Sequence, residues 1–254
     1  SQRRVTTSGI QSMRDYSKSQ GTAYSMTDRP HSAWSLSLFD ECPRLAFYRV
    51  EEGWEEPEAA IELLFGRLIH DGLAWLRAPA MEAAHPLDWN AHIVSVVQRL
   101  RVKALAAGLD ELAAEQPPGK RTNRTTKTLL RSVVWYADHY GQADQVALVP
   151  VLGERVEIPW TWQHDGRSYK GRIDRMADFL GLLYVLEYKH TTSAVDWRYW
   201  ARYALALQNT IYLHALAPLM APRAVEGVLI DVIEVQTGAT WFHRKPIFVS
   251  EAVA

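Results

Sequence analysis

Two closely spaced runs of β-strand character near the middle of the chain constrain its fold most strongly. Tyr169–Ala177 and Leu182–His190 have the composition of β-strands, and the turn-prone segment Asp178–Gly181 separates them. We therefore expect the two runs to pair as a hairpin. The stretch Leu182–Leu186 is almost continuously apolar, which is typical of a strand that is covered on both faces of its sheet.

Charged side chains interrupt these two runs. The first run carries Asp174 and the second carries Glu187 and Lys189, which share a face of the strand and can be joined there by Asp174 in a hairpin. By itself, Glu-x-Lys is more typical of the solvated face of an ordinary strand. At the end of a buried strand, however, charges are costly unless they are paired or bind a metal. The context therefore favours a site in which two carboxylates hold a hard divalent cation beside an ammonium group.

The composition is that of a soluble globular protein, because apolar residues make up 48% and charged residues 22% of 254 positions. The formal net charge of −1 gives no global basicity, so any surface for nucleic acid must be local. The single cysteine, Cys42, excludes an intramolecular disulfide and a multi-cysteine zinc or iron–sulfur site. The sequence contains no apolar run of membrane-spanning length and no signal peptide at its start. We therefore expect a cytoplasmic protein with no membrane partner.

The patterns along the chain divide it into three parts. Residues 1–30 have the composition of a flexible, mildly basic tail, 31–150 of a helical part and 151–254 of a strand-rich core. We expect one compact domain over 31–254. The expected helices are two short pieces within 35–48 divided at Pro43, then Ile61–Leu76, Trp89–Ala107, Thr126–Tyr140 and Trp197–Ala217. The other expected strands are Glu154–Trp162, which turns at His164–Gly166 into the first run, Val225–Val235 and Thr240–Val249.

Two further features lie on the expected helices. Gly66 and His70 are four residues apart and share a face, where the glycine permits close approach of another element. From the helix alone, a packing glycine and a core histidine are the favoured interpretation. Before the third helix, four cations accompany the amides of the helix N-terminus and either bind phosphates or form a solvated helix start. These cations are Lys120, Arg121, Arg124 and Lys127.

Taken together and in order, the motifs resemble those of a known family. Asp174, followed after twelve residues by Glu187-x-Lys189, is similar to the pattern of the PD-(D/E)XK nuclease superfamily, and Gly171 matches its Gly-x-x-Asp entry to the site. The RecB-like branch adds Gly-x-x-x-His upstream and Gln-x-x-x-Tyr downstream, which here are Gly66–His70 and Gln208–Tyr212. The resemblance covers roughly residues 35–249, and it is closest to phage exonucleases and to the RecB-like nucleases of CRISPR adaptation.

This resemblance implies a restriction-endonuclease-like α/β (α+β) fold, in which helices flank a central mixed β-sheet and the N-terminal half is helical. It implies a site for Mg²⁺ or Mn²⁺ whose ligands are His70, Asp174, Glu187 and the carbonyl group of Tyr188. Lys189 would complete the catalytic set by positioning water or stabilising the phosphorane. Glu154 falls at an acidic position that is often near such sites. Some members carry an iron–sulfur cluster, but this chain lacks the cysteines for one, so none is expected.

The function implied by the resemblance is a metal-dependent DNA nuclease, and we expect an exonuclease of phage or bacterial DNA recombination or processing. Gln208, Tyr212 and the four cations would contact DNA. Trp197, Tyr199 and Trp200 would either stack on unpaired bases or pack within the protein. The expected partners are single-stranded or duplex DNA ends and a single-strand annealing or replication protein. The alternatives are a structure-specific endonuclease, a catalytically silent DNA-binding member, and a carboxylate–metal hydrolase of another substrate.

Overall fold

The computed structural model describes the chain over residues 30–54, 61–78, 88–110, 123–141, 144–151, 156–204 and 206–248. The predictions for Lys120, Arg121, Glu154 and residues 1–29 of the tail lie outside these ranges. Among the helices in the described ranges, none has both the length and the apolar character needed to cross a membrane.

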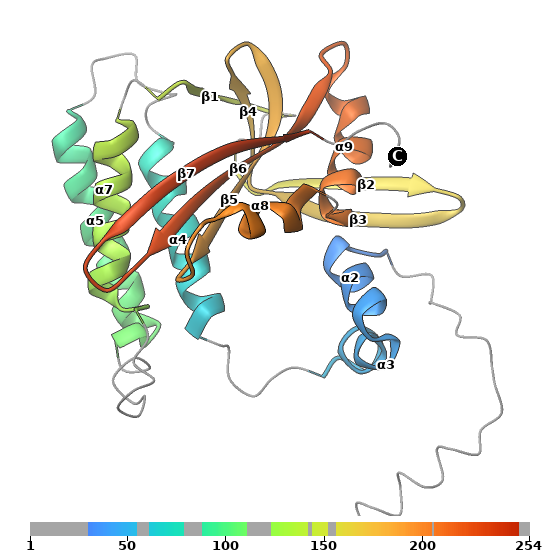
Figure 1. Ribbon diagram of the computed structural model, residues 1–254, viewed down its shortest axis with the longest axis horizontal. Coiled ribbons are helices and arrows are strands. Elements are labelled where there is room, and N and C mark those ends of the chain that lie inside the picture. The colour runs from blue at the N-terminus through green and yellow to red at the C-terminus, as the bar shows by residue number, and fades with distance from the viewer. Residues whose placement is uncertain are drawn as a thin grey trace, which may run out of the picture.

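A five-stranded mixed sheet forms the centre of the protein (Figure 1). Its strands, in spatial order, are β1 (Val146–Val149), β4 (Arg175–Phe179), β5 (Leu182–Thr191), β6 (Val225–Val235) and β7 (Thr240–Phe248). The hairpin expected around Asp178–Gly181 is present, because β4 and β5 pair antiparallel. β5 pairs parallel with β6, and β6 pairs antiparallel with β7. The expected mixed sheet is therefore confirmed.

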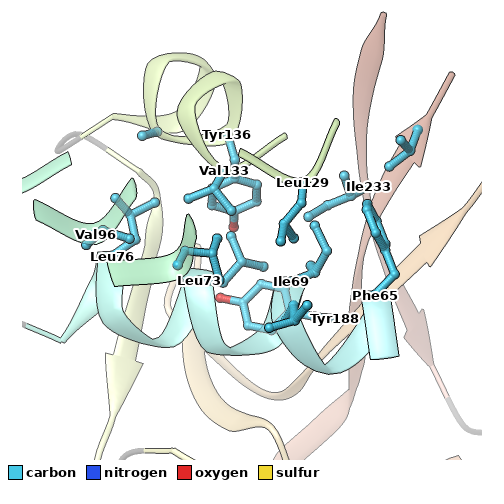
Figure 2. Close-up of a cluster of buried hydrophobic side chains, with 14 of the residues drawn as sticks. Phe65, Ile69, Leu73, Leu76, Val96, Leu129, Val133, Tyr136, Tyr188 and Ile233 are labelled. Carbon is cyan, nitrogen blue, oxygen red and sulfur yellow. The ribbon is translucent and has the colours of Figure 1, made fainter. Parts of the chain in front are cut away.

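Side chains of β5 alternate between two hydrophobic clusters on opposite faces of this sheet. Leu186 and Tyr188 belong to the cluster formed with three helices, whereas Leu183 and Val185 belong to the other cluster. The three helices are α4 (Ile61–Arg77), α5 (Trp89–Ala106) and α7 (Thr126–Tyr140). Figure 2 shows their apolar side chains packed together above Tyr188. Burial on both faces agrees with the continuous apolar pattern of this strand.

The second face is covered by a helix and a separate two-stranded sheet. The helix is α9 (Leu207–Met220), and the sheet is the hairpin of β2 (Ile158–His164) and β3 (Arg167–Ile173). Asp165 and Gly166 form the turn, with φ of 49° and 72°, as a two-residue hairpin loop with both central residues left-handed requires. Near this hairpin lie α2 (Ala33–Glu41), α3 (Pro43–Ala46) and a π-helix (Phe47–Glu51) (Figure 1). Because α2 ends at Glu41 and α3 begins at Pro43, the expected break at Pro43 is confirmed.

The run Tyr169–Ala177 was expected to be one strand, and this expectation is wrong. The chain bends at Asp174, where it leaves β3, paired with β2, and enters β4, paired with β1 and β5. The Asp174 carboxylate accepts a hydrogen bond from the backbone N–H of Tyr188, with 2.8 Å between Oδ2 and N. A side chain therefore satisfies a backbone donor of β5 at the point where the neighbouring strand bends away.

The expected single helix Trp197–Ala217 is also wrong, because the structure contains α8 (Trp197–Ala204) and then α9. Asn209 donates from Nδ2 to the carbonyl oxygen of Tyr203 at 2.7 Å. This bond satisfies an acceptor at the end of α8 that a continuous helix would have paired with its own backbone. Neither proline nor glycine lies at the break, so the sequence pattern does not predict it.

Candidate active site

The bend at Asp174 places this carboxylate beside the end of β5. In the β4–β5 register Arg175 pairs with Leu186. Asp174, the residue before Arg175, therefore lies level with Glu187. Glu187 and Lys189 lie on one face of β5, and the distance from Lys189 Nζ to Glu187 Oε1 is 2.6 Å. The hairpin therefore gathers two carboxylates and one ammonium group at one edge of the sheet.

Helix α4 adds a histidine to these groups. His70 Nδ1 lies 3.2 Å from Asp174 Oδ1, and His70 Nε2 lies 3.2 Å from the carbonyl oxygen of Tyr188. Gly66, one turn earlier, allows the helix to come this close, because a Cβ atom at this position would lie 2.7 Å from Cε1 of His190. The motif that the helical pattern alone assigned to packing is thus in direct contact with the carboxylate site.

Helix α9 supports Glu187 from the other side. Gln208 Nε2 donates to Glu187 Oε1 at 3.2 Å, and it also donates to the hydroxyl oxygen of Tyr212. The Tyr212 hydroxyl in turn donates to the carbonyl oxygen of Arg172 at 3.3 Å. These bonds fix the Glu187 carboxylate between Lys189 and the amide of Gln208, and they connect it to the β3 backbone.

Burial and charge shift the ionisation of these groups. Glu187 is only 7% exposed, and burial together with the negative charge of Asp174 raises its pKa. Burial acts to lower the pKa of Lys189, but the charge of Glu187 and their hydrogen bond raise it above its usual value. At His70, burial acts to lower the pKa, but the hydrogen bond to Asp174 and the negative charge of Asp174 raise it above its usual value. Lys189 is therefore an ammonium cation at neutral pH, suited to stabilise negative charge rather than to remove a proton.

Glu157 is a further acidic residue at this site, and the sequence analysis missed it. One ligand atom each from Glu157, His70 and Asp174 all lie within 4.8 Å of one another, which suits a shared metal ion. Counting back from the two-residue turn at Asp165–Gly166 places Glu157 opposite Asp174, and this count could have found it. We had instead expected the acidic position at Glu154, which lies outside the described residues.

A cavity of about 440 Å³ opens beside these groups. Its lining includes Gly66, His70, Glu157, Tyr188, Lys189 and His190. Carboxylate oxygens with one imidazole are donors that suit Mg²⁺ or, because of the imidazole, Mn²⁺. The residues present therefore fit a divalent metal ion that has open coordination positions facing the cavity.

The N-terminus of α7 is a weaker site for a phosphate than the nearby cations predicted. The backbone N–H of Thr126 donates to Asp110 Oδ1 at 2.9 Å, and that of Thr128 donates to Thr125 Oγ1 at 3.2 Å. These two amides are thus already engaged. Arg124 Nη1 lies 3.2 Å from Glu62 Oε1 at the cavity, and Lys127 is exposed.

The three aromatic residues of α8 have different surroundings. Tyr199 is buried and packs within the cluster on the second sheet face, whereas Trp197 is exposed and Trp200 is half-buried. The charged group of Arg202 stacks 3.8 Å from the centre of the Tyr199 ring. Packing therefore accounts for Tyr199, and Trp197 is the most exposed of the three, with the charged group of Arg198 5.1 Å from the centre of its ring.

The mixed sheet brings Asp174, Glu187 and Lys189 together beside His70, which is the arrangement that the resemblance to restriction-endonuclease-like proteins implies. The chain belongs to the PD-(D/E)XK nuclease superfamily, whose model matches residues 30–246. In overall structure it is similar to a candidate exonuclease from Eubacterium rectale, with a TM-score of 0.51, 14% identity, and coverage of 92% of this chain and 79% of that one.

A second solved structure, that of the protein SSO0001, matches less well. It has 14% identity, a TM-score of 0.28, and coverage of 73% of this chain and 79% of that one. Comparison with curated proteins gives no match. The family model confirms the expected superfamily, and the Eubacterium rectale structure agrees with the expected fold; membership of the superfamily implies a nuclease.

Proposed function

We propose that the protein is a metal-dependent deoxyribonuclease that hydrolyses phosphodiester bonds at the carboxylate site. The observation that carries this proposal is the convergence of Asp174, Glu187 and Lys189, with His70 held 3.2 Å from Asp174. These four side chains come from three separate motifs, Gly-x-x-x-His, Gly-x-x-Asp and Glu-x-Lys, and a solvated strand face would not bring them together. The complete set also argues against a catalytically silent DNA-binding protein.

Each side chain then has a chemical role. Asp174, Glu187, His70 and the carbonyl group of Tyr188 would hold Mg²⁺ or Mn²⁺, and Glu157 extends this ligand set. When bound, such an ion lowers the pKa of a water molecule and stabilises charge on the scissile phosphate. Lys189, a cation held against Glu187, stabilises the charge that develops on the phosphorane or positions the attacking water.

Gln208 and Tyr212 act on this site from α9. Gln208 orients the Glu187 carboxylate, and its own position is fixed by Tyr212. The DNA backbone would pass near these two residues and toward the start of α7, where Arg124 pairs with Glu62 of the cavity wall and Lys127 is exposed. Attraction of phosphates to these cations should weaken as salt concentration rises.

We further propose that the enzyme acts on DNA ends, as an exonuclease of recombination or processing. The cavity between α4 and the sheet supports this, because a recessed site admits a strand end more readily than the middle of a closed duplex. The similar protein from Eubacterium rectale, described as a candidate exonuclease, is consistent with this proposal. A structure-specific endonuclease is the second candidate.

The test compares labelled linear single strands with covalently closed single-stranded circles of the same sequence, with Mg²⁺ or Mn²⁺ and with a chelator. Linear strands should be degraded in the presence of metal, and circles should survive. Equal rates on both substrates would instead favour the endonuclease. No degradation of any DNA with either metal would contradict the nuclease proposal itself.

A further inference from the structure

A second cavity, of about 340 Å³, lies on the other side of Gln208 from the catalytic carboxylates. It is formed by α2, the β2–β3 hairpin and α9, and its walls include Trp34, Trp160, Gly171, Arg172, Gln208 and Tyr212. Its volume is at the lower end of the range of small-molecule sites, about 300–1,000 Å³. No role in the chemistry described above accounts for this cavity.

Helix α2 is held in place over the hairpin. The backbone N–H of His31 donates to the carbonyl oxygen of Ser168, and the N–H of Lys170 donates to that of His31, both at 2.8 Å. Ser32 and Ser35 then form a capping box at the start of the helix. These bonds fix Trp34 at the cavity, although its side chain remains 55% exposed. A large indole held in an ordered helix but left in solvent is well suited to contact a ligand.

The floor of the cavity carries an unsatisfied donor. Trp160 is 3% exposed, and its Nε1 has no hydrogen-bond partner among the described residues. A buried donor in this state costs stability, which is why such groups generally have a partner. The edge of the indole ring that bears Nε1 lies against Gly171, where an added Cβ would be 2.5 Å from Cζ2 and 3.1 Å from Nε1. Gly171 therefore leaves the room that the Trp160 indole fills at the floor of the cavity, where Nε1 is itself covered.

Charge and connectivity link this cavity to the catalytic site. Arg172 is exposed at its wall and precedes Asp174 by two residues in the chain. Gln208 lines the cavity and also donates to Glu187 Oε1. A ligand in the cavity is therefore separated from the catalytic carboxylate by one side chain.

We propose that this cavity binds the unpaired nucleobase next to the scissile phosphate, with the base stacked on Trp34 and the adjoining phosphate near Arg172. The proposal rests on the nuclease function proposed above. A base can enter such a cavity only when it is unstacked and unpaired, so the subsite selects a single-stranded end. Recognition is expected to tolerate all four bases, because every base has a face that can stack on an indole.

The test measures binding and cleavage of a single-stranded oligonucleotide by wild type, Trp34→Ala, Trp34→Phe and Trp241→Ala. Trp241 on β7 is 48% exposed and does not line the cavity, so it is a matched control. Binding is measured with each change in an Asp174→Asn background. Trp34→Ala should lose about 5- to 150-fold in affinity, equivalent to about 1–3 kcal/mol for one stacked base. Trp34→Phe should retain most of the affinity, and Trp241→Ala all of it.

A second arm places a single abasic site at successive positions of the oligonucleotide. At one position, loss of the base should weaken binding to the protein that retains Trp34 as much as Trp34→Ala weakens binding of the intact oligonucleotide. The same loss should have no further effect on binding to the Trp34→Ala variant. Equal affinities of Trp34→Ala and Trp241→Ala, or abasic penalties that are the same in all variants, would overturn the subsite. If these penalties appear but wild type cleaves no DNA with either metal, the subsite stands as a nucleic-acid site and the nuclease proposal fails.

Discussion

Glu157 and Asp174 face each other where the β2–β3 hairpin meets the central sheet, and the backbone N–H of Glu157 donates to the carbonyl oxygen of Asp174 at 3.0 Å. Glu157 has a φ of 52°, a left-handed conformation that is uncommon for a residue other than glycine. Such strain persists where surrounding structure enforces it, and here it brings a carboxylate to within reach of His70 and Asp174.

Glu157→Gln is therefore expected to weaken metal binding about tenfold or more, because it removes a charged oxygen from the ligand set. The dissociation constants of Mg²⁺ and Mn²⁺ are measured by calorimetry for both proteins. Glu226→Gln, which changes an exposed glutamate of β6, is the control and should bind metal as wild type does. Unchanged metal affinity in Glu157→Gln would remove this residue from the site.

His70→Ala should reduce activity more at low metal concentration than at saturation. The imidazole contacts Asp174 and the Tyr188 carbonyl oxygen, so its loss weakens the ligand set without removing either carboxylate. Because imidazole suits Mn²⁺ better than Mg²⁺, the shift should be larger for Mn²⁺. Metal titrations of DNA cleavage on both proteins measure the effect, and parallel curves would assign His70 to packing alone.

Arg244→Ala should lower the free energy of unfolding by about 3–5 kcal/mol, because it removes the cation paired with the buried Asp231 carboxylate, whereas Asp144 keeps Arg77. Arg244 lies 2.6 Å from both Asp231 Oδ2 and Asp144 Oδ1, and the Asp231 side chain is fully buried. Denaturant unfolding measures the loss. Arg223→Ala breaks a partly exposed ion pair with Asp178 and should cost no more than about 1 kcal/mol. Similar losses in the two variants would contradict the account.

His190 should make stability depend on pH. Burial, followed by the charge of Arg124, lowers its pKa to about 4 from an ordinary value of 6.5. The unfolded chain therefore binds this proton more tightly than the folded protein does, so stability is lost as the pH falls from about 6.5 to 4. The loss is at most about 3 kcal/mol for a shift of this size.

The measurement for His190 is chemical unfolding at pH 7 and pH 4.5 in the presence of a chelator. The difference in unfolding free energy between wild type and His190→Gln should narrow or change sign at the lower pH, because the variant has no proton to gain there. His164→Gln, which alters an exposed histidine at the β2–β3 turn, should follow wild type at both values. A pH-independent difference for His190→Gln would contradict the shifted pKa.

The sequence was enough to predict that Asp174, Glu187 and Lys189 come together, because a local hairpin carries all three. Alternation along a strand and a short turn determine which faces these side chains share. His70 and Gln208 depend on the packing of helices against the sheet, and only the family resemblance placed them. Glu157 was within reach of the same hairpin counting, but the expected strand began at Glu154, four residues before the observed start at Ile158.

The remaining features depend on contacts between distant segments that periodicity does not encode. The second cavity exists because His31 pairs with β3, which carries Trp34 to the hairpin from more than a hundred residues away. The separation of α8 from α9 depends on a hydrogen bond from Asn209 that overrides favourable helix propensity. Such tertiary contacts follow from the assembled fold rather than from any single stretch of residues.

The central claim is that Asp174, Glu187 and Lys189 form one catalytic unit. The most direct test measures metal-dependent cleavage of end-labelled DNA by Asp174→Asn, Glu187→Gln and Lys189→Met, with Glu226→Gln as the control and thermal unfolding as the check on folding. Each of the three is expected to remain folded and to lose at least about a hundredfold in rate, while the control cleaves as wild type does. Undiminished cleavage by purified, folded Asp174→Asn would contradict the account.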